Sequence, residues 1–158
     1  MKKILVLFAI LLIIIGGVYF AQNYLKEGKT GNSPTANVII GNHTFKVSEA
    51  VSQQEQEIGL SETGSIAQDQ GMIFLFKAPS YYSFWMKNMK FPIDIIYIKD
   101  DTIVTIKSNA QPPKNTSENL IIYTPSDPAD KVLEIQAGLS QKYNFKNGDK
   151  VKYENLSN

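Results

Sequence analysis

One short stretch, residues 84–101, holds four side chains that could do chemistry together. They are the chain's only tryptophan and, within the next nine positions, an amine, an amide and an acid: Trp85, Lys87, Asn88 and Asp94. An exposed tryptophan face beside an acid and an amide suits the binding of a sugar or another polar ring compound. The stretch therefore predicts Trp85, Lys87, Asn88 and Asp94 as ligand-binding residues.

Two other roles for Asp94 stay open. In the first, Asp94 is structural, a partly buried carboxylate that pairs with Lys87 or accepts hydrogen bonds from backbone N–H groups of the loop. In the second, Asp94 is the general acid or base of an enzyme, with Lys87 or Asn88 stabilising charge. No complete catalytic set accompanies it, so binding is favoured over catalysis.

Two extended segments must position these side chains. In residues 93–99, strict alternation places Asp94 on the face opposite its two neighbours in sequence. We expect residues 82–88 and 93–99 to form a hairpin around "NMKFP". Such a hairpin brings Asp94 opposite or diagonal to Lys87 and Asn88.

The remaining candidates for chemistry are weaker. His43, the only histidine, is expected in a hairpin turn, and Glu134 is expected as a solvent-facing or paired acid of a strand. The chain has no cysteine, which excludes disulfides, zinc–thiolate sites and thiol nucleophiles. It has no calcium-loop pattern, no glycine-rich phosphate loop and no Gly-x-Ser-x-Gly elbow. We therefore predict no metal and no cofactor.

Charge and composition exclude several partners. The 158 residues carry a formal net charge of +1, which gives no general reason to expect nucleic acid. All 16 basic residues are lysines, so bidentate arginine recognition of phosphate or carboxylate is absent. A hydrophobic content of 43% is enough for the core of one globular domain.

The N-terminus is predicted to be a membrane anchor. Residues 4–21 carry no charge and follow Lys2 and Lys3. This length approaches the roughly 20 apolar residues that span a bilayer, and the lysines favour a cytoplasmic N-terminus. A cleaved signal peptide is the alternative. We assign residues 1–25 to the anchor or signal segment, residues 26–36 to a flexible tether, and residues 37–158 to an extracytoplasmic domain.

The exported domain is predicted to be all-β, a β-sandwich or small barrel, with one short helix. Short apolar runs alternate with turn signals such as Gly41-Asn42, Asp100-Asp101 and Asn147-Gly148. Ser52 followed three residues later by Glu55 predicts the capping box of the helix.

The sequence resembles an uncharacterised family, domain of unknown function 192, from about residue 38 to residue 153. The motifs that carry the resemblance are "GLSETGSIAQDQGMIFLF", "FWMKNMKFPIDIIYI", "VLEIQAG" and "NGDKV". The most specific matching residues are Trp85, Met86, Lys87, Asn88, Pro92 and Asp94. The weaker motifs are matched by Gly59, Leu60, Gly71, Met72, Phe74, Leu133, Glu134, Gly138, Gly148 and Asp149.

The resemblance implies a compact all-β domain, often exported or membrane-tethered, with no settled activity. This chain departs from the family pattern at three positions. Ser61 and Thr63 stand where the family usually has methionine and arginine, and Met89 stands where threonine is common. A role of that arginine in binding an anionic group is therefore not carried over.

Together these observations predict a single-pass membrane protein whose extracytoplasmic β-domain binds a small polar ligand or a partner at the cell envelope. The first alternative is an envelope enzyme that uses Asp94 as general acid or base. The second is a non-catalytic assembly protein that recruits another envelope protein through a sheet edge or apolar patch.

Overall fold

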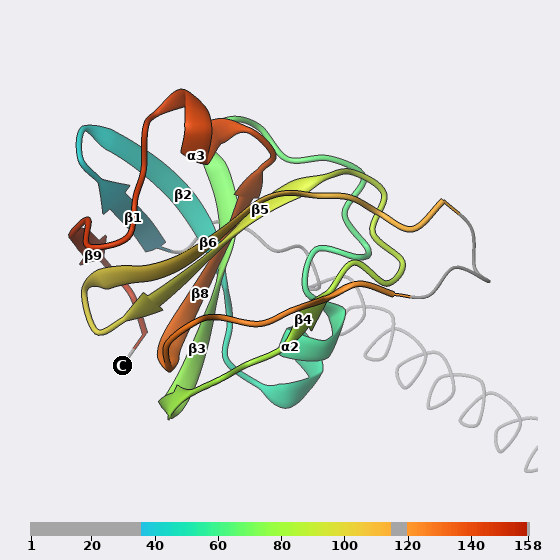
Figure 1. Cartoon of the computed structure of the whole chain (residues 1–158), viewed down its shortest axis with the longest axis horizontal. Helices are drawn as coiled ribbons and strands as arrows, with labels where there is room; N and C mark the ends of the chain where they lie inside the picture. Colours follow the sequence, from blue (N-terminus) through green and yellow to red (C-terminus); the bar gives the residue numbers. More distant parts are fainter. Residues whose placement is uncertain (1–35, 115–119, 158) are drawn as a thin grey trace, which may run out of the picture. The chain divides into compact units, whose positions relative to one another are not determined.

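The computed structural model describes residues 36–114 and 120–157, and it shows a mostly-β domain built on one curled sheet (Figure 1). The predicted fold class is confirmed at this level. The predicted membrane anchor and all of the tether except Ala36 lie outside the described residues. Within the described part of the chain, no helix has the length and apolar character needed to cross a membrane.

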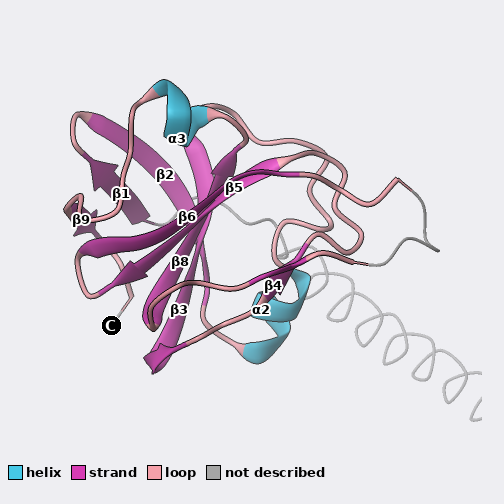
Figure 2. Cartoon of the chain, in the orientation of Figure 1, coloured by secondary structure: helices cyan, strands magenta, loops and turns pink. Residues whose placement is uncertain are grey.

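Seven strands form the sheet in the order β6-β5-β8-β3-β2-β1-β9. Their bounds are β1 Ala36–Ile40, β2 His43–Ala50, β3 Gln70–Ser80, β5 Ile93–Lys99, β6 Thr102–Ala110, β8 Ala129–Gln136 and β9 Val151–Glu154. All neighbours are antiparallel except β2 and β3, which are parallel. The crossover between these two carries helix α2, Gln53–Ile58 (Figure 2).

The sheet curls until its two edges meet at one end. The backbone N–H of Val151, at the start of β9, donates to the carbonyl of Asp101, which precedes β6, at 2.8 Å. Ile103 adds two bonds, donating to Asp149 at 3.0 Å and accepting from Gly148 at 2.8 Å. These bonds satisfy backbone groups that an open sheet would leave exposed at its edges.

Local sequence signals place several turns and the first helix correctly. Gly41 lies between β1 and β2 at a φ of 59°, and Asp100 lies between β5 and β6 at a φ of 55°. The Ser52 hydroxyl accepts from the backbone N–H of Glu55, and the Glu55 carboxylate accepts from the backbone N–H of Ser52, which is the predicted capping box.

The sheet is buried on both faces around β5 and β8. On the inner face, Ile96 and Ile98 of β5 pack with Leu133 and Ile135 of β8. On the outer face, apolar residues of β3, β5 and β8 pack beneath α2 and the loops: Met72, Phe74, Ile93, Ile95, Tyr97 and Val132. Strands buried on both sides read as continuous apolar runs, as "IDIIYI" does.

The predicted hairpin of residues 82–88 with residues 93–99 is wrong. Strand β4, Phe84–Trp85, pairs instead with β7, Ile122–Tyr123, in a separate two-stranded ribbon. Strand β5 has β6 on one side and β8 on the other, so it offers no free edge to β4.

A second short helix, α3 (Leu139–Lys142), was not predicted. It follows Gly138, whose φ of 84° falls in the left-handed region that glycine occupies without strain. One turn of helix is too short to give a periodic apolar pattern.

The carboxylate of Asp94 holds α3 against the sheet. One oxygen, Oδ1, accepts from the backbone N–H groups of Asn109 at 2.7 Å and Gly138 at 3.0 Å. The other, Oδ2, accepts from the backbone N–H of Ser140 at 2.8 Å. Asp94 is fully buried. These contacts fit the structural role that was left open for Asp94, but the donors come from β6, the β8–α3 connection and α3 itself rather than from Lys87 or the adjacent loop.

Replacing Asp94 by asparagine should destabilise the domain. Asparagine keeps one acceptor oxygen and puts an NH₂ donor in place of the other, so at least one buried N–H group loses its acceptor. We expect the free energy of unfolding to fall by about 2–4 kcal/mol. Urea denaturation of the purified protein measures this loss.

The matched control is Asp69→Asn, at an exposed carboxylate 3.3 Å from the Lys46 amine. This control should change stability by less than about 1 kcal/mol. Equal stability of Asp94→Asn and the wild type would show that the three hydrogen bonds do not hold the fold together.

Candidate ligand-binding site

A cleft of about 190 Å³ opens on the outer face of the sheet, between α2, the β4 segment and strands β3 and β8. At about 30 Å³ per molecule, this volume equals that of roughly six waters, which fits a small ligand or one end of a larger one. Five of the lining residues are aromatic: Phe74, Phe76, Tyr82, Phe84 and Trp85. Two are acidic, Glu57 and Glu134.

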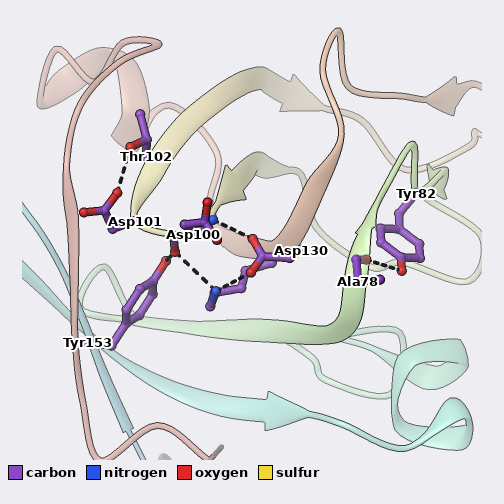
Figure 3. Close-up of polar contacts among 8 residues, drawn as sticks. Ala78, Tyr82, Asp100, Asp101, Thr102, Asp130 and Tyr153 are labelled. Atoms are coloured by element: carbon purple, nitrogen blue, oxygen red, sulfur yellow. Dashed lines mark hydrogen bonds and ion pairs between the residues drawn. The ribbon is translucent and has the colours of Figure 1, made fainter.

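The aromatic walls are fixed by contacts among themselves. Tyr82 stacks on Phe76 with ring centroids 3.6 Å apart, and its hydroxyl donates to the carbonyl of Ala78 at 2.8 Å (Figure 3). Phe84 meets Phe74 edge to face at 4.9 Å. These contacts give the cleft a preformed shape, which lowers the entropy lost when a ligand binds.

Trp85 lies at the cleft with 51% of its surface exposed. The ribbon sets its direction: in the same segment Phe84 and Met86 pack into the outer core, so Trp85 faces outward. A half-exposed indole beside a cavity can stack on a ligand without first leaving a core.

Glu134 is the most unusual group of the cleft. It is 6% exposed, and its Oε2 atom is buried with no hydrogen-bond partner among the residues that the structure describes. Burial raises the pKa of the Glu134 carboxyl to about 8, so the carboxyl is mostly protonated at neutral pH. The expectation of a solvent-facing or paired strand acid is wrong.

The neighbouring strands explain why Glu134 lacks a partner. It sits in β8 between Met72 of β3 and Ile95 of β5, both apolar. The Tyr97 hydroxyl lies within electrostatic reach of Glu134: burial, and after it the Glu134 charge, raise the pKa of Tyr97. The Tyr97 hydroxyl, however, donates to the carbonyl of Tyr123 at 2.8 Å.

Gly71 allows β3 to lie close to β8 beside Glu134. A Cβ atom at Gly71 would come within 2.5 Å of the Glu134 carbonyl oxygen, closer than any real contact allows. The glycine is therefore needed for the backbone approach at this point in the sheet.

The four residues predicted for the site do not come together. Trp85 lines the cleft, whereas Lys87 and Asn88 are exposed and do not line it. Asp94 points to the inner face, as its partner Ile135 does, while Glu134 and its partner Ile95 share the outer face. The structure thus places Glu134, and not Asp94, in the cleft with Trp85.

Glu134 could have been found from the sequence by a different signal. It lies in "KVLEIQ", where strand neighbours on both sides are apolar. If β8 had been recognised as a central strand buried on both faces, an acid within it would have to be buried too.

The other polar clusters are satisfied internally. Asp100 donates its backbone N–H to Asp130 at 2.7 Å and accepts from Tyr153 at 3.0 Å and from Lys131 at 3.2 Å (Figure 3). Lys131 also pairs with Asp130 at 2.6 Å.

His43 is the first residue of β2, and its ring stacks on that of Tyr143 with ring centroids 3.7 Å apart. Over the residues the structure describes, no group of three or more histidines and acids could hold a metal ion.

Comparison with known proteins shows the family. The model of domain of unknown function 192 (DUF192, "Uncharacterized ACR") matches residues 36–153. The chain belongs to DUF192. No curated protein matches this DUF192 chain.

Two solved structures are similar to the DUF192 domain. One is a protein of unknown function from Novosphingobium aromaticivorans DSM 12444, with 33% identity, a TM-score of 0.64, and coverage of 74% of this chain and 82% of that one. The other is from Sinorhizobium meliloti 1021 and is described as a "putative transcription regulator". It has 33% identity, a TM-score of 0.66, and coverage of 77% of this chain and 93% of that one.

The raised pKa of Glu134 predicts that stability depends on pH. Between its ordinary pKa of 4.5 and about 8, the folded protein holds this proton and the unfolded chain does not. Raising the pH then favours unfolding, by up to about 1.4 kcal/mol per pH unit in this window. Outside the window, Glu134 adds no pH dependence.

Urea denaturation from pH 4 to pH 9, wild type against Glu134→Gln, isolates this contribution. The variant lacks the titrating group, so its stability should decline less with rising pH than that of the wild type. Parallel stability curves for the two proteins would mean that Glu134 has an ordinary pKa in the folded state.

Proposed function

We propose that this DUF192 protein is a membrane-anchored extracytoplasmic domain that binds a small ligand in the cleft between α2, β4 and β8. The observation that carries the proposal is the buried Oε2 of Glu134, which has no hydrogen-bond partner among the described residues and belongs to a cleft that the half-exposed Trp85 also lines. Buried polar atoms in proteins nearly always have a partner, and an exception in a cleft marks a place where a ligand can supply it.

The shape of the cleft also supports binding. Its aromatic walls offer flat apolar surface, and one buried polar group among them can fix the orientation of a ligand. The two sides of the cleft, α2 and the β4 ribbon, are separate small elements attached to a rigid sheet, so the shape of the site is set by the fold.

The location at the membrane rests on the sequence. Residues 4–21 form an uncharged apolar segment after two lysines, and residues 26–36 have the composition of a flexible tether. A tether of this length would keep the binding domain near the membrane surface.

An enzyme that uses Asp94 receives little support. Its two oxygens already accept three backbone N–H groups, and its side chain faces away from the cleft. In the cleft, the residue in a position to act as an acid or base is Glu134. Binding requires fewer correctly placed groups than catalysis does, so binding is the simpler function for this site.

The assembly role remains a second candidate because apolar side chains are exposed at the β4–β7 ribbon. Ile122, which pairs with Trp85 in the ribbon, is 52% exposed, and Ile121, which precedes the ribbon strand, is 64% exposed. Exposed apolar residues grouped in this way can form an interface with another protein.

The binding proposal predicts that Trp85 responds to the ligand. Because it is the only tryptophan, its fluorescence reports on the cleft directly. We expect at least one compound in a panel of envelope sugars, peptides and small amines to change the Trp85 emission saturably in the full-length protein. Trp85→Ala should weaken that compound at least tenfold by calorimetry, about 1.4 kcal/mol or more.

Tyr81→Ala provides the matched control, because Tyr81 is an aromatic residue with 57% exposure, four positions before Trp85 in the sequence, that does not line the cleft. This variant should bind as the wild type does. Equal binding by Trp85→Ala, or no hit in the panel together with a stoichiometric protein partner from membranes, would favour the assembly role.

A further inference from the structure

We propose that the ligand of this cleft is a small organic ammonium ion, with its charged nitrogen at Glu134 and its apolar part between the aromatic walls. The inference rests on the proposed binding function and names the chemical class of the ligand. It is drawn from the charges, the aromatic surface and the unpaired atom of the cleft.

The charged groups of the cleft are all acidic. The lining contains Glu57 and Glu134, and it contains no lysine among the residues that the structure describes. Glu57 is exposed and accepts from the side-chain amide of Gln53 at 2.9 Å. With no cation at hand, an anionic ligand would be repelled by Glu57, whereas a cation would be attracted by Glu57 and by Glu134 once that carboxyl is ionised.

The aromatic lining suits the same class of ligand. Ammonium groups are attracted to the faces of tryptophan, tyrosine and phenylalanine, most strongly to tryptophan. The cleft presents Trp85 half exposed, together with the stacked pair of Tyr82 and Phe76 and the ring of Phe84. Aromatic surface of this kind is a common means by which proteins recognise ammonium ligands.

Glu134 supplies the atom that the ammonium group needs. Its Oε2 is buried and accepts no hydrogen bond from the residues that the structure describes, and the Glu134 residue lines the cleft. An N⁺–H group of the ligand would donate to it in a water-poor site, where a charge-assisted bond is strong. A neutral ligand with a carbonyl group could also accept from protonated Glu134, but it would gain nothing from Glu57.

Binding of the cation is coupled to loss of a proton. Because burial raises the pKa of the Glu134 carboxyl to about 8, the free site is mostly protonated at neutral pH. The ammonium ion stabilises the ionised form, so the Glu134 proton passes to the solvent while the ligand keeps its own. The bound state is then a carboxylate–ammonium pair, and its net charge equals that of the protonated free site.

Three probes of similar shape test the charge preference in the full-length protein. They are 2-phenylethylammonium, the neutral 2-phenylethanol and the anionic phenylacetate. We expect Trp85 fluorescence and calorimetry to show 2-phenylethylammonium binding at least about tenfold tighter than the alcohol, with phenylacetate weakest. Calorimetry at pH 7 in buffers of different ionisation enthalpy should show release of close to one proton per bound cation.

Glu134→Gln tests the residue itself. Glutamine resembles the protonated acid in shape, so the cleft should stay folded, and the affinity for 2-phenylethylammonium should fall at least about tenfold with no proton released. The affinity for 2-phenylethanol should change little. Glu62→Gln, the same change at an exposed acid that does not line the cleft, should alter neither.

The outcomes separate the two proposals. If the alcohol binds as tightly as the ammonium ion, or if no proton is released, the cation assignment is wrong while the cleft still binds ligands. If none of the three probes binds at concentrations up to about 10 mM, which corresponds to a free energy weaker than about −3 kcal/mol, the cation assignment is wrong. The proposed binding function fails as well only if the wider panel of sugars, peptides and amines also gives no hit.

Discussion

Three backbone N–H groups converge on the carboxylate of Asp94, and the arrangement of the sheet around β5 depends on them. They come from Asn109 near the end of β6, from Gly138 at the N-terminus of α3 and from Ser140 within α3. Because Asp94 belongs to β5, its carboxylate links that strand to its neighbour β6 and to the segment that follows its other neighbour, β8. Strand β8 pairs with β5 from Ile93 to Ile98, and this pairing places Glu134 opposite Ile95.

The two buried acids have opposite environments on opposite faces of the same sheet. On the inner face, Asp94 has three donors within 3.0 Å. On the outer face, Glu134 has an unpaired oxygen and a pKa raised by burial to about 8. A carboxyl without a partner in an apolar surrounding costs stability, and an apolar residue of similar size would avoid that cost. The hydrogen bonds of Asp94 explain why an acid is buried at that position, whereas the buried Oε2 of Glu134 makes no such bond with the described residues.

This difference fits a site in which stability is given up for binding. Functional groups are often the ones that a structure leaves imperfectly satisfied. Here the unsatisfied group lies beside the exposed indole of Trp85 and the stacked rings of Tyr82 and Phe76. The cleft therefore brings together the two features that residues 84–101 were expected to combine, an aromatic face and an acid, but the acid comes from β8.

The sequence predicted correctly those features that depend on residues close together in the chain. The Ser52 capping box, the Gly41 turn and the alternation that sets Asp94 apart from Ile95 all need only neighbouring residues to specify them. The pairing of β4 with β7 could not be read in this way, because it joins segments nearly 40 positions apart.

The position of Glu134 was also beyond a local pattern. Alternation within β8 is compatible with an exposed outer face, and only the cover provided by α2 and the β4 segment makes that face buried. The resemblance to DUF192 included Glu134 in a motif, but a motif does not tell whether the side chain is buried or has a hydrogen-bond partner. Which of two acids is left without partners is decided by the packing of several distant segments.

The most direct measurement is a pH titration of the Glu134 side-chain carboxyl carbon by ¹³C NMR, with the signal assigned through its absence in Glu134→Gln. A buried, unpaired carboxyl predicts a midpoint near 8 in the ligand-free protein. A midpoint near the ordinary value of 4.5 would contradict it, since the carboxyl would then be solvated or paired and the cleft would have no unsatisfied group for a ligand.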